Sequence, residues 1–113
     1  RVLFGMVSTN WLQVSATNVL ADNTWVHVAI TYDGSKTASG VKFYYDGALE
    51  TNIVVEAGTP GNDLSNASDA HIGTRGATSY LFKGDIGEVL VYNRALSVTE
   101  ITQIYNATRW RYI

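Results

Sequence analysis

The sequence predicts an all-β domain: a sandwich of two antiparallel sheets, followed by one short helix near the C-terminal end. β-Branched and aromatic residues are frequent and fall in short runs, and turn-forming pairs such as Asp33-Gly34 and Asp46-Gly47 separate these runs. Only one stretch, which follows Ser97, has apolar residues at helical spacing. Several short strands with turn signals between them are typical of a sandwich or jelly roll, not of a fold with alternating strands and helices.

The first part of the chain predicts three strands. Residues 2–7 and 11–16 are apolar runs on either side of a short polar turn. The third run, WVHVAITYDG over residues 25–34, alternates between two faces, with Val28 and Ile30 on one face and His27 on the other. Because neither face carries a charge, we expect this strand to lie inside a sheet.

The middle and late parts of the chain predict a hairpin, a polar loop and a last strand. Asp46-Gly47 lies between two β-rich runs and suits a type I′ turn, which needs positive φ at both central residues. Residues 56–70 are the most polar and turn-rich stretch. We expect a short strand at residues 71–73 and a final long strand over residues 81–92, LFKGDIGEVLVY.

The C-terminal helix is specified by its first residues. Ser97 is a good N-cap, and Glu100, three residues later, completes a capping box. Leu96 before the cap and Ile101 inside the helix suit a hydrophobic staple. We therefore expect a helix over residues 98–106 with one apolar face packed on the sandwich.

Composition limits the classes of function. A chain of 113 residues suits one domain, and its 46% hydrophobic and 16% charged residues exclude a disordered segment. A net charge of −2 without a basic patch argues against nucleic acid as a partner, and no apolar run is long enough to insert into a membrane. There is no cysteine, so disulfides and thiolate chemistry are excluded. Because residue 1 is Arg and not an initiator Met, we expect the chain to be a processed product or part of a longer protein.

Four motifs in this order resemble a known family. They are WVHVAITYDG, FYYDG about a dozen residues later, HIG, and FKGDIGEVLVYNRALSVTEI. As a set they resemble the laminin G-like modules of the concanavalin A-like lectin/glucanase superfamily. The resemblance covers residues 25–105 and implies a jelly roll of two antiparallel sheets with a short helix near the C-terminal end. It also implies a module of a larger secreted, cell-surface or phage structural protein that binds glycans or other proteins.

Two departures from the family pattern carry expectations of their own. Relatives have more strands before the WVHVAITYDG motif, so the single domain over residues 1–113 is expected to lack N-terminal strands or to be part of a longer protein. Some sheet edge or hydrophobic face should then lack its usual partner strand. In several branches an Asp that helps to bind calcium stands where this chain has Gly87, so no calcium is expected there.

The sequence does not show the paired carboxylates that a glycoside hydrolase of this superfamily would need. Glycoside hydrolysis needs two carboxylates that flank one bond, and Asp85 and Glu88 would point to opposite faces of a strand. His27 lies mid-strand, where we expect its side chain to form a hydrogen bond beneath neighbouring strands. We therefore predict a chain that is not an enzyme.

The candidate ligand-binding residues lie in the loops between residues 58 and 82. They combine carboxamides, carboxylates, a cation and an aromatic ring, which is the mixture that sugar binding uses: Asn62, Asp63, Asn66, Asp69, Arg75 and Tyr80. Asp63 and Asp69 are also candidate calcium ligands, although Asn and Asp are common in turns for their backbone alone. No other cofactor is expected.

Three functions remain open from the sequence. The first is a non-catalytic recognition or adhesion module that binds glycans or proteins through edge loops, outside the cell, on its surface or in a virion. The second is a structural module that assembles with other domains or chains and binds no small ligand. The third, with the least support, is a glucanase-like glycoside hydrolase.

Overall fold

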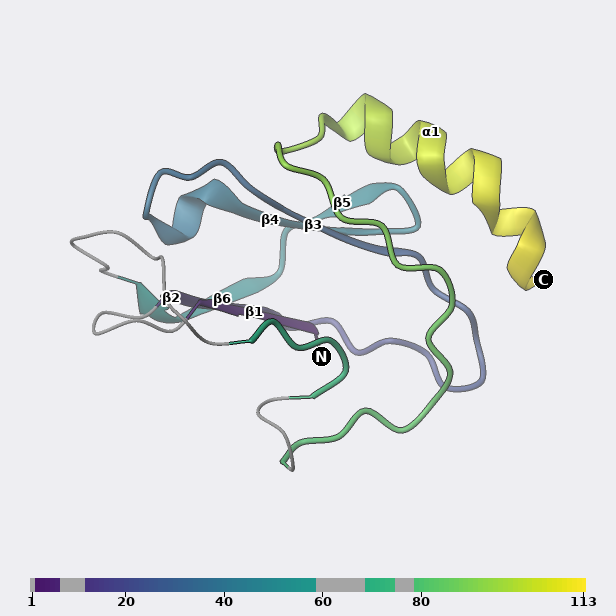
Figure 1. Ribbon diagram of the computed structural model, residues 1–113, viewed down its shortest axis with the longest axis horizontal. Helices are drawn as coiled ribbons and strands as arrows, with labels where there is room; N and C mark the ends of the chain where they lie inside the picture. The colour runs from purple at the N-terminus through teal and green to yellow at the C-terminus, as the bar shows by residue number, and fades with distance from the viewer. Residues whose placement is uncertain (1, 7–11, 59–68, 75–78) are drawn as a thin grey trace.

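The computed structural model describes residues 2–6, 12–58, 69–74 and 79–113, and every structural statement below concerns these residues. They form two antiparallel sheets of three strands each, one α-helix and two short 3₁₀-helices (Figure 1). The elements are β1 (Val2–Met6), β2 (Leu12–Ala16), β3 (Val28–Tyr32), η1 (Ala38–Gly40), β4 (Val41–Tyr45), β5 (Ala48–Glu50), β6 (Ile53–Gly58), α1 (Val98–Thr108) and η2 (Arg109–Tyr112). The predicted all-β class with one C-terminal helix is confirmed.

The two sheets lie one above the other, with α1 on the outer side of the second sheet (Figure 1). The first sheet has the order β1-β2-β6 and the second the order β3-β4-β5. The chain passes between them after Glu50: β5 pairs with β4, and β6 then pairs with β2 in the first sheet. This crossing ties the two layers together within a few residues.

The hydrophobic core lies between the two central strands. Leu12, Val14 and Ala16 of β2 pack against Val41 and Phe43 of β4, and all five are essentially inaccessible to solvent. Partly buried side chains from β1, β3 and the start of η1 surround this cluster. Each central strand therefore contributes its alternate residues to one shared core, as a sandwich requires.

The hairpin between β4 and β5 confirms the turn prediction. Asp46 and Gly47 have φ values of 51° and 82°, and Tyr45 pairs with Ala48 across the two-residue loop. A side chain at position 47 would also meet α1, because a Cβ there would lie 3.3 Å from the Cα of Thr102. Gly47 thus serves both the turn and the close approach of the helix.

The helix begins where the sequence predicts, and it docks on this hairpin. Ser97 is the N-cap of a complete capping box, and Ile101 is 1% exposed. The Thr102 hydroxyl donates a hydrogen bond of 3.0 Å to the carbonyl oxygen of Gly47. The helix extends two residues beyond the predicted end, and residues 109–112 then form η2.

Three strand predictions are wrong in the described structure. Residues 71–73 and 81–92 form no strand, and β3 lies at the edge of its sheet and not inside it. Residues 81–92 have the apolar alternation of a strand, but a strand also needs a neighbouring edge for its backbone groups. Residues 81–92 instead run as an irregular trace from below the first sheet, up one side of the molecule, towards the segment that leads into α1 (Figure 1).

Candidate functional site

Only two of the predicted ligand-binding residues lie in the described part of the chain. Asp69 is exposed, and Tyr80 is 80% exposed with a φ of 54°. Neither lines the groove described below. The remaining four predicted residues lie outside the described residues: Asn62, Asp63, Asn66 and Arg75.

Of the two candidate calcium ligands, Asp69 lies in the described part of the chain and Asp63 lies outside the described residues. Among the residues that the structure describes, no group of three or more His, Asp or Glu side chains is placed to hold a metal ion. Gly87, which stands where the resemblance places an Asp, has a different neighbour. A Cβ at this position would lie 2.7 Å from the hydroxyl oxygen of Tyr112, so the absence of a side chain makes room for that ring.

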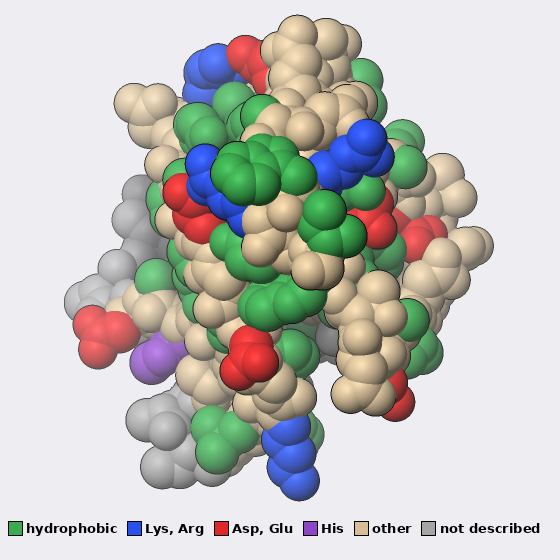
Figure 2. Space-filling view, turned by 90° about the vertical axis from the view of Figure 1, so that its right-hand side faces the viewer, with side chains coloured by type: hydrophobic (Ala, Val, Ile, Leu, Met, Phe, Trp, Pro, Cys, Tyr) green, Lys and Arg blue, Asp and Glu red, His purple; other side chains and the backbone are tan. Residues whose placement is uncertain are grey.

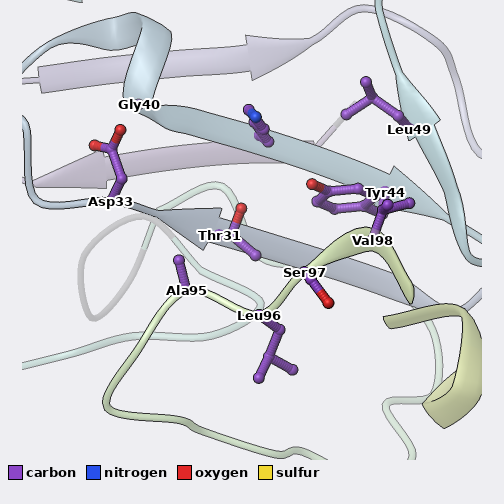
Figure 3. A pocket seen from close by; sticks show the side chains of 10 residues that line it. Thr31, Asp33, Gly40, Tyr44, Leu49, Ala95, Leu96, Ser97 and Val98 are labelled. Atoms are coloured by element: carbon purple, nitrogen blue, oxygen red, sulfur yellow. The ribbon is translucent and has the colours of Figure 1, made fainter. Parts of the chain in front are cut away.

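A groove of about 300 Å³ lies on the outer face of the second sheet, beneath the segment that leads into α1 (Figure 3). Residues of β3, β4 and β5 form its floor, and residues 95–98 form its wall. The lining residues are Thr31, Asp33, Gly40, Lys42, Tyr44, Leu49, Ala95, Leu96, Ser97 and Val98.

The register of the sheet explains the floor of the groove. Thr31 pairs with Lys42 and Tyr44 pairs with Leu49, so these four side chains point to the same outer face. Tyr44 is only 4% exposed, and it lies beside Leu49 and Val98 (Figure 3). The floor therefore has an apolar end at Tyr44 and a polar end at Thr31 and Lys42.

Asp33 supplies the negative charge at the polar end. Its Oδ1 accepts a hydrogen bond of 2.8 Å from the backbone N–H of Ser35. Hydrogen bonds from Ser35, together with attraction from Lys42, hold the pKa of this carboxyl below its ordinary value. The carboxylate lies against Gly40, where a side chain would collide with it. The groove thus presents an ionised carboxylate at neutral pH, and the Lys42 side chain belongs to the same lining.

The wall of the groove is fixed by the start of the helix. The backbone N–H of Glu100 donates to Ser97 Oγ at 3.2 Å, and that of Ser97 donates to Glu100 Oε2 at 2.9 Å. The guanidinium of Arg94 donates to both carboxylate oxygens of Glu100, at 2.9 and 2.6 Å. These hydrogen bonds lower the pKa of Glu100 to about 2. Residues 95–97 are therefore fixed on both sides by hydrogen bonds, those of Arg94 on one side and those of the capping box on the other.

His27 lies outside the groove, next to the hairpin turn. Its backbone N–H donates to Asp46 Oδ1 at 3.0 Å, and its ring lies 5.8 Å from the ring of Tyr105. Burial lowers the pKa of the imidazole, and Asp46 offsets part of this effect. Nδ1 is buried without a hydrogen-bond partner, so the side-chain hydrogen bond expected from the sequence is wrong for this nitrogen.

Asp33 and Lys42 are groove residues that the sequence did not predict. Asp33 belongs to the predicted Asp33-Gly34 turn, and it follows the WVHVAITY run directly. Lys42 is the one charged residue in VKFYY, and it lies two positions before Tyr44. This spacing places both side chains on one face of a strand, and from it a polar and aromatic outer face could have been predicted.

The glycosidase hypothesis can be compared with this groove. Asp33 is the only carboxylate among its lining residues. Glu88, one of the acids considered from the sequence, instead accepts a hydrogen bond of 2.9 Å from the guanidinium of Arg111. The described groove therefore offers one carboxylate and one ammonium group, a combination that suits hydrogen bonding to a ligand better than glycoside cleavage.

One solved structure matches the fold of this chain. It is the 2.1 Å crystal structure of an S-layer domain-containing protein, residues 221–444, from Clostridium thermocellum ATCC 27405. The TM-score is 0.56 and the identity 18%, and the match covers 90% of this chain but 61% of that one. The chain thus spans less than two thirds of the length of its structural relative. None of the curated proteins matches the sequence.

The family of the chain follows from its sequence motifs and from one further comparison. No helix in the described part of the chain has both the length and the apolar character to cross a membrane. A laminin G-like family model, described as concanavalin A-like lectin/glucanases superfamily, matches residues 1–102. This range includes most of the motifs that carried the resemblance, from the WVHVAITYDG run to the start of the helix. The chain belongs to the concanavalin A-like lectin/glucanase superfamily.

Proposed function

We propose that this chain is a non-catalytic recognition module that binds a glycan in the groove between the second sheet and residues 95–98. The observation that supports it is the division of the groove into an apolar and a polar end. Leu49 and Val98, which are each about half exposed, offer apolar surface to the C–H face of a sugar ring. Asp33 and Lys42 offer an ionised acceptor and a donor to its hydroxyl groups.

The size and rigidity of the groove support a small ligand. Its volume of about 300 Å³ lies at the lower end of the range for ligand pockets, which suits one or two sugar rings. The floor belongs to a paired sheet, and the wall is held by the capping box and by Arg94. A site built on such fixed elements loses little conformational entropy when a ligand binds.

The proposed setting is a larger extracellular, cell-surface or virion protein. The structural relative is an S-layer domain-containing protein. A module of such a protein would use its rigid sandwich to present a binding face outward. The complete jelly roll implied by the family needs more strands than the six described and stays a prediction.

The loop residues predicted from the sequence remain a second proposed contact surface. Tyr80 supports this idea because it is an aromatic residue in a loop and is 80% exposed. Asn62, Asp63, Asn66, Asp69 and Arg75 would surround such a contact. Calcium stays a proposal for Asp63 and Asp69.

A glycan array with the isolated chain, with and without calcium, tests the proposed function. We expect binding to at least one glycan, which isothermal titration calorimetry then quantifies. Lys42→Met should weaken that binding by about tenfold, the value of one charge-assisted hydrogen bond. Lys83→Met, which removes the same charge outside the groove, is the matched control. Absence of binding to every glycan, or equal losses in the two variants, would refute the proposed site.

A structural assembly module is the second candidate function, and a separate observation favours it. Hydrophobic side chains gather on the face where residues 81–92 run towards the helix (Figure 2). Monomeric proteins rarely expose large apolar patches, and such patches mark contacts with other polypeptides. None of residues 81–92 lines the groove, so this contact would use different residues from glycan binding.

A further inference from the structure

The side chain of His27 is enclosed at the place where α1 docks on the hairpin between β4 and β5. Its Nδ1 is buried, and no described residue forms a hydrogen bond with it. The backbone of His27 is paired with Asp46: its N–H donates to Oδ1 at 3.0 Å, and its carbonyl oxygen accepts from the Asp46 N–H at 2.9 Å. His27 is therefore fixed by its backbone, while one nitrogen of its imidazole is left unsatisfied.

Tyr105 connects His27 to the helix. The centres of the two rings are 5.8 Å apart. Tyr105 lies two turns after Val98 on the face of α1 that carries Thr102, which donates a hydrogen bond to the Gly47 carbonyl oxygen at 3.0 Å. The Tyr105 ring also lies against the hairpin turn, because a Cβ at Gly47 would be 3.3 Å from its Cδ1. One face of the helix thus rests on both His27 and Gly47.

The same helix forms part of the groove. Val98, its first residue, belongs to the lining, and Leu49 of the floor follows Gly47 by two positions in the hairpin. The Thr102 hydroxyl oxygen lies 2.8 Å from the carbonyl oxygen of Val98 and 3.0 Å from that of Gly47. Because the hydrogen bonds of α1 join Val98 to Tyr105 over two turns, a shift of the helix at Tyr105 also shifts Val98.

A proton on the His27 ring would disturb this contact. The neutral imidazole leaves one nitrogen without a proton, whereas both nitrogens of the imidazolium are donors. Protonation would place a charged N–H group at a buried position for which the described residues offer no acceptor. An unpaired buried donor on a charged group costs more free energy than an unpaired neutral nitrogen. The docked helix therefore opposes protonation of His27.

The groups around the ring determine the direction of the effect. Asp46 of the turn favours the imidazolium, whereas the guanidinium of Arg109, 5.6 Å from the centre of the Tyr105 ring, adds a positive charge beyond that ring. Burial outweighs the attraction of Asp46 and holds the pKa of His27 below its ordinary value of 6.5. The docked helix is therefore favoured in full above about pH 6.5, and it loses this advantage as the pH falls from 6.5 towards the lowered pKa.

We propose that protonation of His27 releases α1 from the hairpin and thereby opens the wall of the groove. The wall is closed at neutral pH and becomes mobile under mildly acidic conditions. The consequence for glycan binding rests on the proposed function, whereas the release of the helix does not.

Amide hydrogen exchange across α1, corrected for the intrinsic exchange rate, tests the release of the helix. Between about pH 7.5 and about pH 5.5 the opening constant of the helix should rise severalfold in the wild type, to a limit of about tenfold for one proton. His71→Gln, which removes the other histidine of the chain, should show the same rise, and His27→Gln should show none. A His27→Gln variant that keeps the rise, or a wild type without one, overturns the proposal.

A titration of the wild type followed by NMR gives a second test that needs no folded His27 variant. The imidazole resonances of His27, distinguished from those of His71 with the His71→Gln variant, should titrate with a midpoint below 6.5. A midpoint at or above 6.5 would mean that the docked helix does not oppose the proton, and would overturn the proposal.

The glycan array, read at about pH 7.5 and about pH 5.5, tests the consequence for the groove. Signals should fall by about twofold to tenfold at the lower pH for the wild type and His71→Gln, and stay constant for His27→Gln. Asp33 stays ionised over this range, because its pKa is lowered from 3.8. Equal signals at both pH values while the helix opens would overturn the link between helix and groove. Absence of glycan binding at either pH would refute the proposed function, and hydrogen exchange would still decide the release of the helix.

Discussion

Two segments of this chain have the same type of sequence and different structures. VAITY, residues 28–32, forms β3, whereas VLVY, residues 89–92, forms no strand. Both are β-branched and aromatic without a charge. The difference is that VAITY lies beside β4, which pairs with every one of its residues. Local sequence supplies the tendency to be a strand, but an available edge decides whether a strand forms.

The largest expected effect compares the core with the exposed segment. Phe43→Ala empties a site that is 0% exposed, between the two sheets, and should lower the free energy of unfolding by about 3–5 kcal/mol. Phe82→Ala removes the same ring from a site that is 53% exposed and should cost under about 1 kcal/mol. Urea unfolding followed by circular dichroism measures both. Equal losses would mean that residues 81–92 are packed as firmly as the core.

Much of the fold could be predicted because its signals are local. The Asp46-Gly47 turn and the Ser97 to Glu100 capping box each depend on residues within four positions of one another, and both predictions are confirmed. Residues 81–92 could not be predicted correctly in the same way. Their structure depends on whether a distant segment offers a free edge, and alternation of side chains says nothing about that.

The site was harder to predict than the fold. Its floor joins Thr31 to Lys42 across a strand pair, and its wall comes from residues 95–98, more than fifty positions later. Only the register and the docking of α1 on Gly47 bring these parts together. Tyr80 and Asp69, which were predicted from their loop setting, lie outside this groove.

The second expected effect concerns the N-terminal end of α1, which follows residues 81–92 and docks on the second sheet. Ser97→Ala removes the acceptor for the Glu100 N–H and should destabilise the protein by about 1 kcal/mol. The wall of the groove should also become more mobile, because residues 95–97 lose one of the hydrogen bonds that fix their position. Thermal unfolding measures the loss of stability.

Thr99→Ala is the control for this end of the helix, because it removes a hydroxyl from the same helical turn without removing the cap. Alanine has the higher helix propensity, so this variant should be neutral or slightly stabilising. A loss as large as that of Ser97→Ala would show that the helix start is sensitive to any change and that the cap has no special role.

The smallest effect is a dependence of stability on pH that Glu100 should produce. Its pKa is about 2 in the folded chain, below the ordinary value of 4.5, because Arg94 and Ser97 donate hydrogen bonds to the carboxylate. The unfolded chain therefore takes up this proton first as the pH falls, and the stabilisation is complete above about pH 4.5 and lost towards pH 2.

Thermal unfolding of wild type and Glu100→Gln across this pH range measures the difference in stability. The wild type should be the more stable at pH 7, and the gap should close as the pH approaches 2, because both side chains are then uncharged. A gap that stays constant with pH would mean that Glu100 stabilises the helix start through its shape and not through its charge.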